Sequence, residues 1–358
     1  MLKAHRLQNQ QIEFPQYDNP VDVLSHLLAI QGQDFPGAKW SLGLRYPDST
    51  DAQIEAAIAE KKIVRTWLMR GTLFLTTDRD LRWLLDVMGE RVIAISQRRY
   101  KELELDTETL NRSNDILVNA LVDGKQIGRW ALYAILEENG ISTKGQRGVH
   151  IVRHASLESL IVQSTVIKND PVFMMIDDAI PANNLSRDEA LVELARRYFN
   201  SRGWATFQDY VWWTGLLMGD VRAGFEAIQS DLIEETVDGV TYYHMDNALK
   251  QSPESPCVYV PAGFDEYYLG YSDRNPIIDA EYMTNVCPGN NGIFFPTIVI
   301  DGHICGIWKR TIKKKKIQLT AFPFAPLSKE EEAVFLSAIE RYGDYMDMPL
   351  EITIESPA

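Results

Sequence analysis

One order of secondary structure recurs three times along this chain and restricts its fold more than any other feature. Three segments with apolar residues at helical spacing are followed by two short segments rich in β-branched and aromatic residues. Three helices and a hairpin are the parts of a winged helix-turn-helix, whose third helix can enter a DNA groove while the hairpin forms the wing. Repetition at roughly 80 residues favours tandem winged helices over an α-rich protein whose periodicity reports only its cores.

Local signals mark where the repeated units begin and turn. Asn19 followed by Pro20 predicts the start of a helix, and Ser186 with Glu189 forms a capping box at the start of the third unit. Asp238-Gly239 is a type I′ turn signal in the third hairpin. The predicted boundaries are 1–77 for the first winged helix, 78–105 for a connecting helix, 106–180 for the second winged helix, 181–250 for the third, and 251–358 for a C-terminal β-unit.

The C-terminal β-unit has a different pattern from the three repeats. Its strand candidates are short, aromatic and β-branched, and they are broken by Gly, Pro and Asp-Gly. This pattern predicts an antiparallel unit, a small barrel, that is followed by a helix over 328–343 and a last strand over 350–355. The expected fold class is therefore α+β.

The net charge and the local charge distribution give opposite indications about a nucleic-acid partner. The net charge of −14 disfavours such a partner, because binding to phosphate requires a basic surface, and it leaves open a module that binds only other proteins. The stretch WKRTIKKKK over 308–316 is nevertheless densely basic and predicts a hairpin with the charge on one strand. A solvated charge run and a contact with DNA phosphates both remain open for this hairpin.

Three further features concern the environment of the protein. No apolar run is long enough to span a membrane, and the first ten residues lack the apolar centre of a secretory signal. The three cysteines, Cys257, Cys287 and Cys305, are few and widely spaced, which favours a reducing compartment over a disulfide framework or a zinc site. We therefore expect a cytoplasmic protein.

Two glutamines follow an apolar run in LLAIQGQDF over 27–35, and we call Gln31–Gln33 the Q-x-Q segment. A glutamine amide does not titrate, so it cannot act as a base, but it can hold and orient a water molecule. Residues i and i+2 do not share a helix face, so the two amides can converge only if the helix ends before them. From spacing alone, a role as helix caps or as solvent-facing residues explains the pair better.

Five stretches carry a resemblance to a known family. They are QGQ at 31–33, RTWLMRGTL at 65–73, ARRYFNSRGWATFQDYVWWTGL at 195–216, PAGFDEYYLGYSDR at 261–274 and DGHICGIWKR at 301–310. In this order they resemble the AlkZ-like winged-helix DNA glycosylases, relatives of the YcaQ type. The resemblance implies three winged helices around a DNA-sized concave surface and catalytic roles for Gln31 and Gln33. One departure is Phe74, which stands where the family often has histidine.

The implied reaction is hydrolysis of the N-glycosidic bond of alkylated purines, including bulky and cross-linked ones. An N7-alkylated guanine is already a cation, so it leaves without acid assistance, and two amides suffice to position the water. Because no lysine stands at the Q-x-Q segment, we expect a monofunctional enzyme without a Schiff base. Asp34 either assists as a base or caps the next helix.

Candidate DNA-binding residues come from three places in the chain. They are Arg65, Trp67 and Arg70 in the first wing, Lys144 and Arg147 in the second unit, and Lys309, Arg310, Lys313 and Lys314 in the basic hairpin. For Trp67 a buried structural role competes with a place facing DNA. The acids Asp265, Glu266 and Asp273 are expected to fix loops through backbone hydrogen bonds and Arg274.

The full expectation is a monomeric, nucleoid-associated repair enzyme that acts on duplex DNA with alkylated bases. It should need no metal and no cofactor, and it should not associate with a membrane. Two other classes remain open: a non-catalytic winged-helix regulator, which would bind intact duplex without releasing a base, and a structural or protein-interaction module, which would have no DNA affinity.

Overall fold

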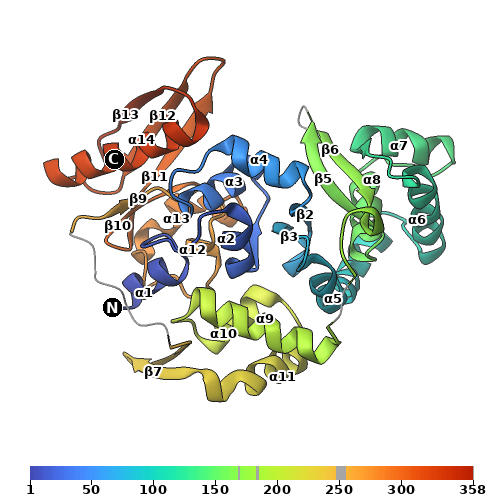
Figure 1. Cartoon of the computed structure of the whole chain (residues 1–358), viewed down its shortest axis with the longest axis horizontal. Helices are drawn as coiled ribbons and strands as arrows, with labels where there is room; N and C mark the ends of the chain where they lie inside the picture. Colours follow the sequence, from blue (N-terminus) through green and yellow to red (C-terminus); the bar gives the residue numbers. More distant parts are fainter. Residues whose placement is uncertain (168–169, 183–184, 247–254, 358) are drawn as a thin grey trace. The chain divides into compact units, whose positions relative to one another are not determined.

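The computed structural model describes residues 1–167, 170–182, 185–246 and 255–357 (Figure 1). The chain is α+β and forms two compact units, each built from segments that are far apart in the sequence. The first unit contains residues 1–55, 195–213 and 228–358, and the second contains 56–194 and 214–227. The predicted boundary at 250/251 lies outside the described residues.

The order of three helices and a hairpin occurs three times. The first set is α2 (Pro20–Leu27), α3 (Phe35–Leu44), α4 (Asp51–Ala59), β2 (Ile63–Trp67) and β3 (Leu73–Thr77). The second is α6 (Thr107–Leu121), α7 (Arg129–Glu138), α8 (Arg147–Leu157), β5 (Ile161–Ile167) and β6 (Asp170–Met175). The third is α9 (Arg187–Arg202), α10 (Phe207–Thr214), α11 (Met218–Ile228), β7 (Ile233–Val237) and β8 (Val240–His244). The long helix α5 (Leu81–Glu102) connects the first set to the second.

The local signals of the sequence act where they were predicted. Asn19 accepts a hydrogen bond from the Asp22 backbone at the start of α2. Ser186 and Glu189 form the reciprocal capping box before α9. The β7–β8 turn has positive φ at both Asp238 and Gly239, +50° and +79°, as a type I′ turn requires.

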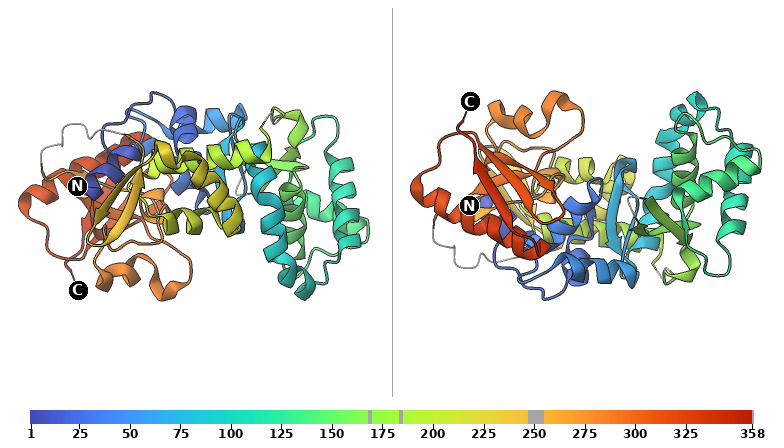
Figure 2. Two further views of the ribbon diagram at one scale, coloured as in Figure 1. Left: turned by 90° about the horizontal axis from the view of Figure 1, so that it is seen from below. Right: turned by 90° about the horizontal axis from the view of Figure 1, so that it is seen from above.

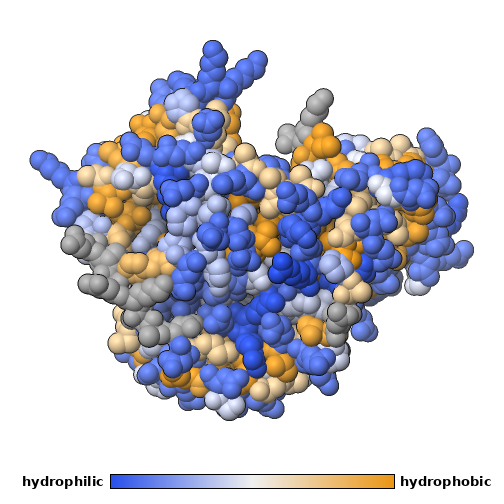
Figure 3. Space-filling view, in the orientation of Figure 1, coloured by the Kyte–Doolittle hydropathy of each residue, from blue (hydrophilic) through white to orange (hydrophobic). Residues whose placement is uncertain are grey.

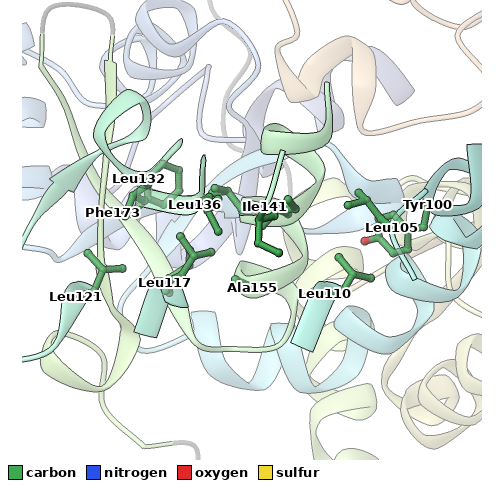
Figure 4. Close-up of a cluster of buried hydrophobic side chains, with 13 residues drawn as sticks. Tyr100, Leu105, Leu110, Leu117, Leu121, Leu132, Leu136, Ile141, Ala155 and Phe173 are labelled. Carbon is green, nitrogen blue, oxygen red and sulfur yellow. The ribbon is translucent and has the colours of Figure 1, made fainter. Parts of the chain in front are cut away.

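The second compact unit has a hydrophobic core between the helices of the second set and the sheet. Its strands lie in the order β3-β2-β5-β6-β4, where β4 (Ile127–Gly128) pairs antiparallel with β6. Leu117 and Leu121 of α6, Leu132 and Leu136 of α7, and Phe173 of β6 pack together in this core (Figure 4). Burial of large apolar side chains, about 1.5–3 kcal/mol each, stabilises this arrangement.

The C-terminal sheet belongs to the first compact unit. It has the order β13-β12-β11-β10-β9, from β9 (Val258–Tyr259), β10 (Thr297–Ile300), β11 (His303–Ile312), β12 (Ile317–Pro323) and β13 (Leu350–Ile354). Helix α14 (Lys329–Met346) connects β12 to β13 and lies against the sheet (Figure 2). There Tyr342 contacts Trp308 of β11, with 5.3 Å between the ring centroids. Shorter helices include α1 (Leu2–Asn9), α12 (Glu266–Leu269) and α13 (Met283–Val286).

The prediction of an antiparallel barrel for this unit is wrong in two respects. Strands β12 and β13 pair in parallel, because α14 carries the chain back to the end where β12 began. Within the described residues the order is also open, with β13 and β9 as its two edges. No helix in the described part of the chain is sufficiently long and apolar to cross a membrane.

Candidate active site

The Q-x-Q segment lies between two helices of the first compact unit. Helix α2 ends at Leu27, the short strand β1 (Ala29–Gln31) follows, and α3 begins at Phe35. The helix therefore ends before both glutamines. Residues two positions apart can converge only outside a helix, so this condition is met. The change of direction falls on Leu28, whose φ of +67° and ψ of −52° are rare for a residue with a side chain.

The two glutamines differ in solvent exposure. Gln31 is 8% exposed and Gln33 is exposed, with the buried Gly32 between them. One amide therefore belongs to the interior of the unit and the other to its surface.

A buried ion pair holds the backbone that leads into the Q-x-Q segment. Arg202 donates to the carbonyls of Leu27 and Ala29 at 2.9 Å each, and to Glu266 Oε2 at 2.8 Å. Glu266 Oε1 accepts the backbone N–H of Gln31 at 3.2 Å. Both charged side chains are almost fully buried, at 0% and 1% exposed. We call Arg202 and Glu266 the 202–266 clamp.

A second buried pair lies on the same short helix as Glu266. Asp265 caps α12 through the Tyr267 N–H and binds Arg45 at 2.7 and 2.8 Å. Burial alone would raise the pKa of Asp265, but the charge and the hydrogen bonds of Arg45 outweigh it and lower the pKa below its ordinary value. The predicted loop-fixing role is confirmed for Asp265 and Glu266, but their partners are Arg45 and Arg202 and not Arg274.

A neutral histidine stands beside the clamp at the end of α2. Burial lowers the pKa of His26 to about 4; a hydrogen bond with the Asn9 carbonyl opposes this effect, and the nearby Arg202 and Arg45 add to it. At neutral pH the ring is therefore uncharged. It adds no positive charge to those of the two arginines.

Asp34 occupies the N-cap position of α3, but it does not cap that helix with its side chain in the described structure. Its carboxylate lies 3.4 Å from the Arg310 guanidinium of β11. A Cβ on Gly37 would lie 2.5 Å from a carboxylate oxygen of Asp34, so glycine leaves space for this side chain. The pair connects the Q-x-Q region with the base of the basic hairpin.

The basic hairpin is formed by β11 and β12, which pair antiparallel from Gly306 to Ile312. Lys313–Lys316 make the connecting loop and are all exposed, so the four lysines do not lie on a strand as predicted. A loop keeps four like charges in water, where their repulsion is screened. Hydrophilic side chains extend from the surface over β12 and β13 (Figure 3).

Two members of the basic hairpin contact neighbouring side chains. The Lys309 ammonium lies over the rings of Phe295 and Phe322, 4.6 and 5.2 Å from their centroids. Lys316 pairs with Glu351 at 2.8 Å, in an arrangement exposed on both sides. Lys314 and Lys315 lie at the tip of the loop, where the Lys313 N–H donates to the Lys316 carbonyl at 2.9 Å.

The candidates from β2 and the β2–β3 connection belong to the second compact unit. Arg65 contacts Gln163 on the neighbouring strand β5 at 3.4 Å. Trp67 is partly buried, stacks on Phe173 at 6.4 Å and packs against the core in Figure 4. Arg70 lies in the β2–β3 connection with a φ of +54°.

The remaining candidates and the family departure also lie in the second unit. Lys144 is exposed just before α8. Arg147 donates to the carbonyls of Ser142, Leu103 and Glu104, so it holds the end of α5 to the α7–α8 loop. Phe74 is fully buried in β3. Among the described residues, no three His, Cys, Asp or Glu side chains are grouped so as to hold a metal ion.

Comparison with known proteins identifies the class of this α+β chain as that of DNA glycosylases. The model of the family "DNA glycosylase AlkZ-like" matches residues 24–345, so the chain belongs to the AlkZ-like DNA glycosylase family. A relative from Streptomyces sahachiroi, named "Interstrand DNA cross-link repair glycosylase", is 23% identical over 350 residues that cover 89% of each chain. The solved structure of the DNA glycosylase AlkZ from Streptomyces sahachiroi matches with a TM-score of 0.82 at 18% identity, over 98% of each chain, and shares the fold.

Proposed function

We propose that this protein is a monofunctional DNA glycosylase that hydrolyses the N-glycosidic bond of N7-alkylated guanines in duplex DNA. The observation that carries the proposal is the Q-x-Q segment, in which a buried Gln31 and an exposed Gln33 follow a backbone fixed by a buried ion pair. Family membership supports the reaction class. The name of the Streptomyces relative supports bulky or cross-linked adducts as substrates.

The proposed chemistry matches what two amides can do. Water attacks C1′ of the sugar while the bond from C1′ to the base nitrogen breaks, and the electron pair of that bond neutralises the cationic base. The proton of the attacking water goes to solvent. Gln31 and Gln33 hold the water through their carbonyl oxygens and direct their dipoles at the developing oxocarbenium charge.

The environment of the nearest lysine supports a mechanism without a covalent intermediate. Lys39 is the first lysine after the Q-x-Q segment, and it is 7% exposed. Its ammonium pairs with Asp51 at 2.9 Å and with Glu55. Two carboxylates hold the Lys39 side chain, so its nitrogen is not available as an amine nucleophile.

The DNA contact that we infer uses three winged helices, one for each set of three helices and a hairpin. The residues that we propose to contact the DNA are Arg65, Trp67, Arg70, Lys144, Arg147, Lys309, Arg310, Lys313 and Lys314. The exposed lysine loop supports the proposal, since clustered positive charge on an acidic chain provides a local binding surface. We infer a monomer that acts in the cytoplasm at the nucleoid.

Base release from a defined duplex tests the function. The purified protein is incubated with DNA that contains N7-methylguanine, and the free base is measured by chromatography. We expect free base and a strand that breaks only after alkali, as an abasic site requires. Breakage without alkali would instead indicate a lyase, and binding of intact duplex without base release would indicate a regulator.

Removal of one lysine at the tip of the basic hairpin should weaken DNA binding in a salt-dependent way. For Lys314→Glu we expect roughly tenfold lower affinity at 0.1 M salt and a log–log salt slope smaller in magnitude by about 1. Lys329→Glu makes the same charge change at an exposed position at the start of α14 and should leave the slope unchanged. Equal effects of the two substitutions would show that only net charge matters.

Asp34→Asn separates a role as general base from the structural pairing with Arg310. If Asp34 only pairs with Arg310, the single-turnover rate of base release should stay within about threefold of the wild-type rate. A general base contributes about 100- to 10,000-fold, so a loss of that size would identify Asp34 as the base. Measurement from pH 5 to 9 would then show whether the remaining rate depends on a titrating carboxylate.

A further inference from the structure

We propose that Arg202 and Glu266 are positioning residues for the reaction, which set the place of Gln31 without touching the substrate. This inference rests on the proposed catalytic role of Gln31. It assigns a task to two charged side chains at the interior of the first compact unit, where an ion pair has no inherent advantage over apolar packing. The 202–266 clamp determines the backbone path from α2 into the Q-x-Q segment.

The guanidinium of Arg202 binds the chain on both sides of the unusual residue. Its NH1 group donates to the Leu27 carbonyl and its NH2 group to the Ala29 carbonyl, each at 2.9 Å. Between these two carbonyls lies Leu28, with its left-handed φ of +67°. The planar fork of arginine therefore spans the turn and fixes the two peptide groups that flank it.

The carboxylate of Glu266 extends the clamp to the first glutamine. Its Oε2 accepts from Arg202 Nε at 3.2 Å and from NH2 at 2.8 Å, and also from Trp213 Nε1 at 2.9 Å. Its Oε1 accepts the Gln31 backbone N–H at 3.2 Å. Both oxygens of one buried carboxylate thus have fixed partners, and one of them is the peptide group of Gln31.

The strained turn explains why such a clamp is needed. A leucine in this region of φ and ψ is conformationally strained. Strained residues persist only when several surrounding contacts hold their backbone in place. Without the clamp, Leu28 would relax toward negative φ and the following strand would change its direction. A displacement of about 1 Å at a catalytic group can lower a rate about 100-fold, so the effect on Gln31 would be large.

The chain contains a closely matched pair that can serve as a control. Arg45 is also 0% exposed; it donates to the backbone carbonyls of Gln10 and Ser41 and binds Asp265 through two hydrogen bonds. Arg45 and Arg202 thus have the same burial and the same kinds of acceptor, and their acids are neighbours on α12. The hydrogen bonds of Arg45 go to the cap residues Gln10 and Asp265 and to α3, whereas those of Arg202 reach residues 27–29.

The test compares Arg202→Lys with Arg45→Lys in the full-length protein. Lysine keeps the charge opposite the acid but cannot bridge two carbonyls and a carboxylate with one planar group. We measure the single-turnover rate of N7-methylguanine release and the Kd for the same duplex, at a temperature where circular dichroism shows both variants folded. For Arg202→Lys we expect a rate about 10- to 100-fold below wild type at an unchanged Kd. For Arg45→Lys, whose own hydrogen bonds do not reach residues 27–29, the loss of rate should be severalfold smaller than for Arg202→Lys, at an unchanged Kd.

The rates of the two variants distinguish a positioning role of the clamp from a role in folding alone. A wild-type rate in folded Arg202→Lys, or equal losses in both variants, would overturn it, because the clamp would then contribute only to folding. If Arg202→Lys does not fold, Glu266→Gln and its control Asp265→Asn repeat the comparison with the acids. A wild-type protein that releases no base would instead refute the proposed function itself, and this result is seen before any variant is measured.

Discussion

Alanine at Gln31 or Gln33 is expected to lower the rate of base release by about 100- to 1,000-fold while the Kd for damaged DNA changes little. The estimate is the cost of removing one preorganised polar group from a site where charge develops. Gln31 is buried and its peptide group is fixed, so its amide would hold the water in one place. Gln33 is exposed and would complete the site when DNA covers it. Single-turnover kinetics measure the rate, and fluorescence anisotropy measures the Kd.

The double variant and an unrelated glutamine sharpen this test. If the two amides act on one water molecule, Gln31→Ala with Gln33→Ala should lose little more rate than either single variant, because groups that act as a unit are not additive. Gln97→Ala, at an exposed position on α5, should retain the wild-type rate. A wild-type rate in both single variants would remove the catalytic assignment of the Q-x-Q segment.

Asp265→Ala should lower the free energy of unfolding by about 3–5 kcal/mol, the largest stability effect that we expect from a single substitution. The substitution leaves the fully buried guanidinium of Arg45 without its carboxylate partner. It also removes the cap of α12, the helix that carries Glu266. Urea denaturation followed by tryptophan fluorescence gives the change in free energy.

An exposed ion pair provides the control for this stability effect. Asp231 pairs with Arg196 at 3.4 Å and is 51% exposed, so Asp231→Ala should cost at most about 1 kcal/mol. The two variants should also differ in acid. Because the folded-state pKa of Asp265 lies below its ordinary value of 3.8, its contribution is present above pH 3.8 and is lost as the pH falls through the lowered value. Stability of Asp265→Ala should therefore depend less on pH in this range than that of the wild-type protein.

The order of elements could be predicted because its causes are local. Asn19, the Ser186–Glu189 capping box and Asp238-Gly239 each act within four residues, and the apolar periodicity between them requires no knowledge of the rest of the chain. The end of α2 before Gln31 also agrees with the expectation from the sequence. These signals predict where helices and hairpins lie, but they do not predict which segments meet.

The clamp could not be predicted because its partners are distant in the sequence. Arg202 and Glu266 are 64 positions apart, and Arg45 and Asp265 are 220 positions apart. A weak signal existed, since both acids stand in the otherwise apolar and aromatic stretch that contains Tyr267 and Leu269. The parallel pairing of β13 was missed for a similar reason: a final strand has no local mark of its neighbour.

Helix α12 has a consequence for how this protein can be divided. Two consecutive acids at the start of this four-residue helix, the N-cap Asp265 and Glu266, each reach a different arginine, one at the end of α3 and the other at the end of α9. Three stretches of sequence therefore meet at one peptide unit beside the glutamines. A fragment that ends before residue 255 could retain all three sets of three helices and a hairpin, yet it would lack the two acids that hold Arg45 and Arg202. Chimaeras made between members of this family should exchange these stretches together.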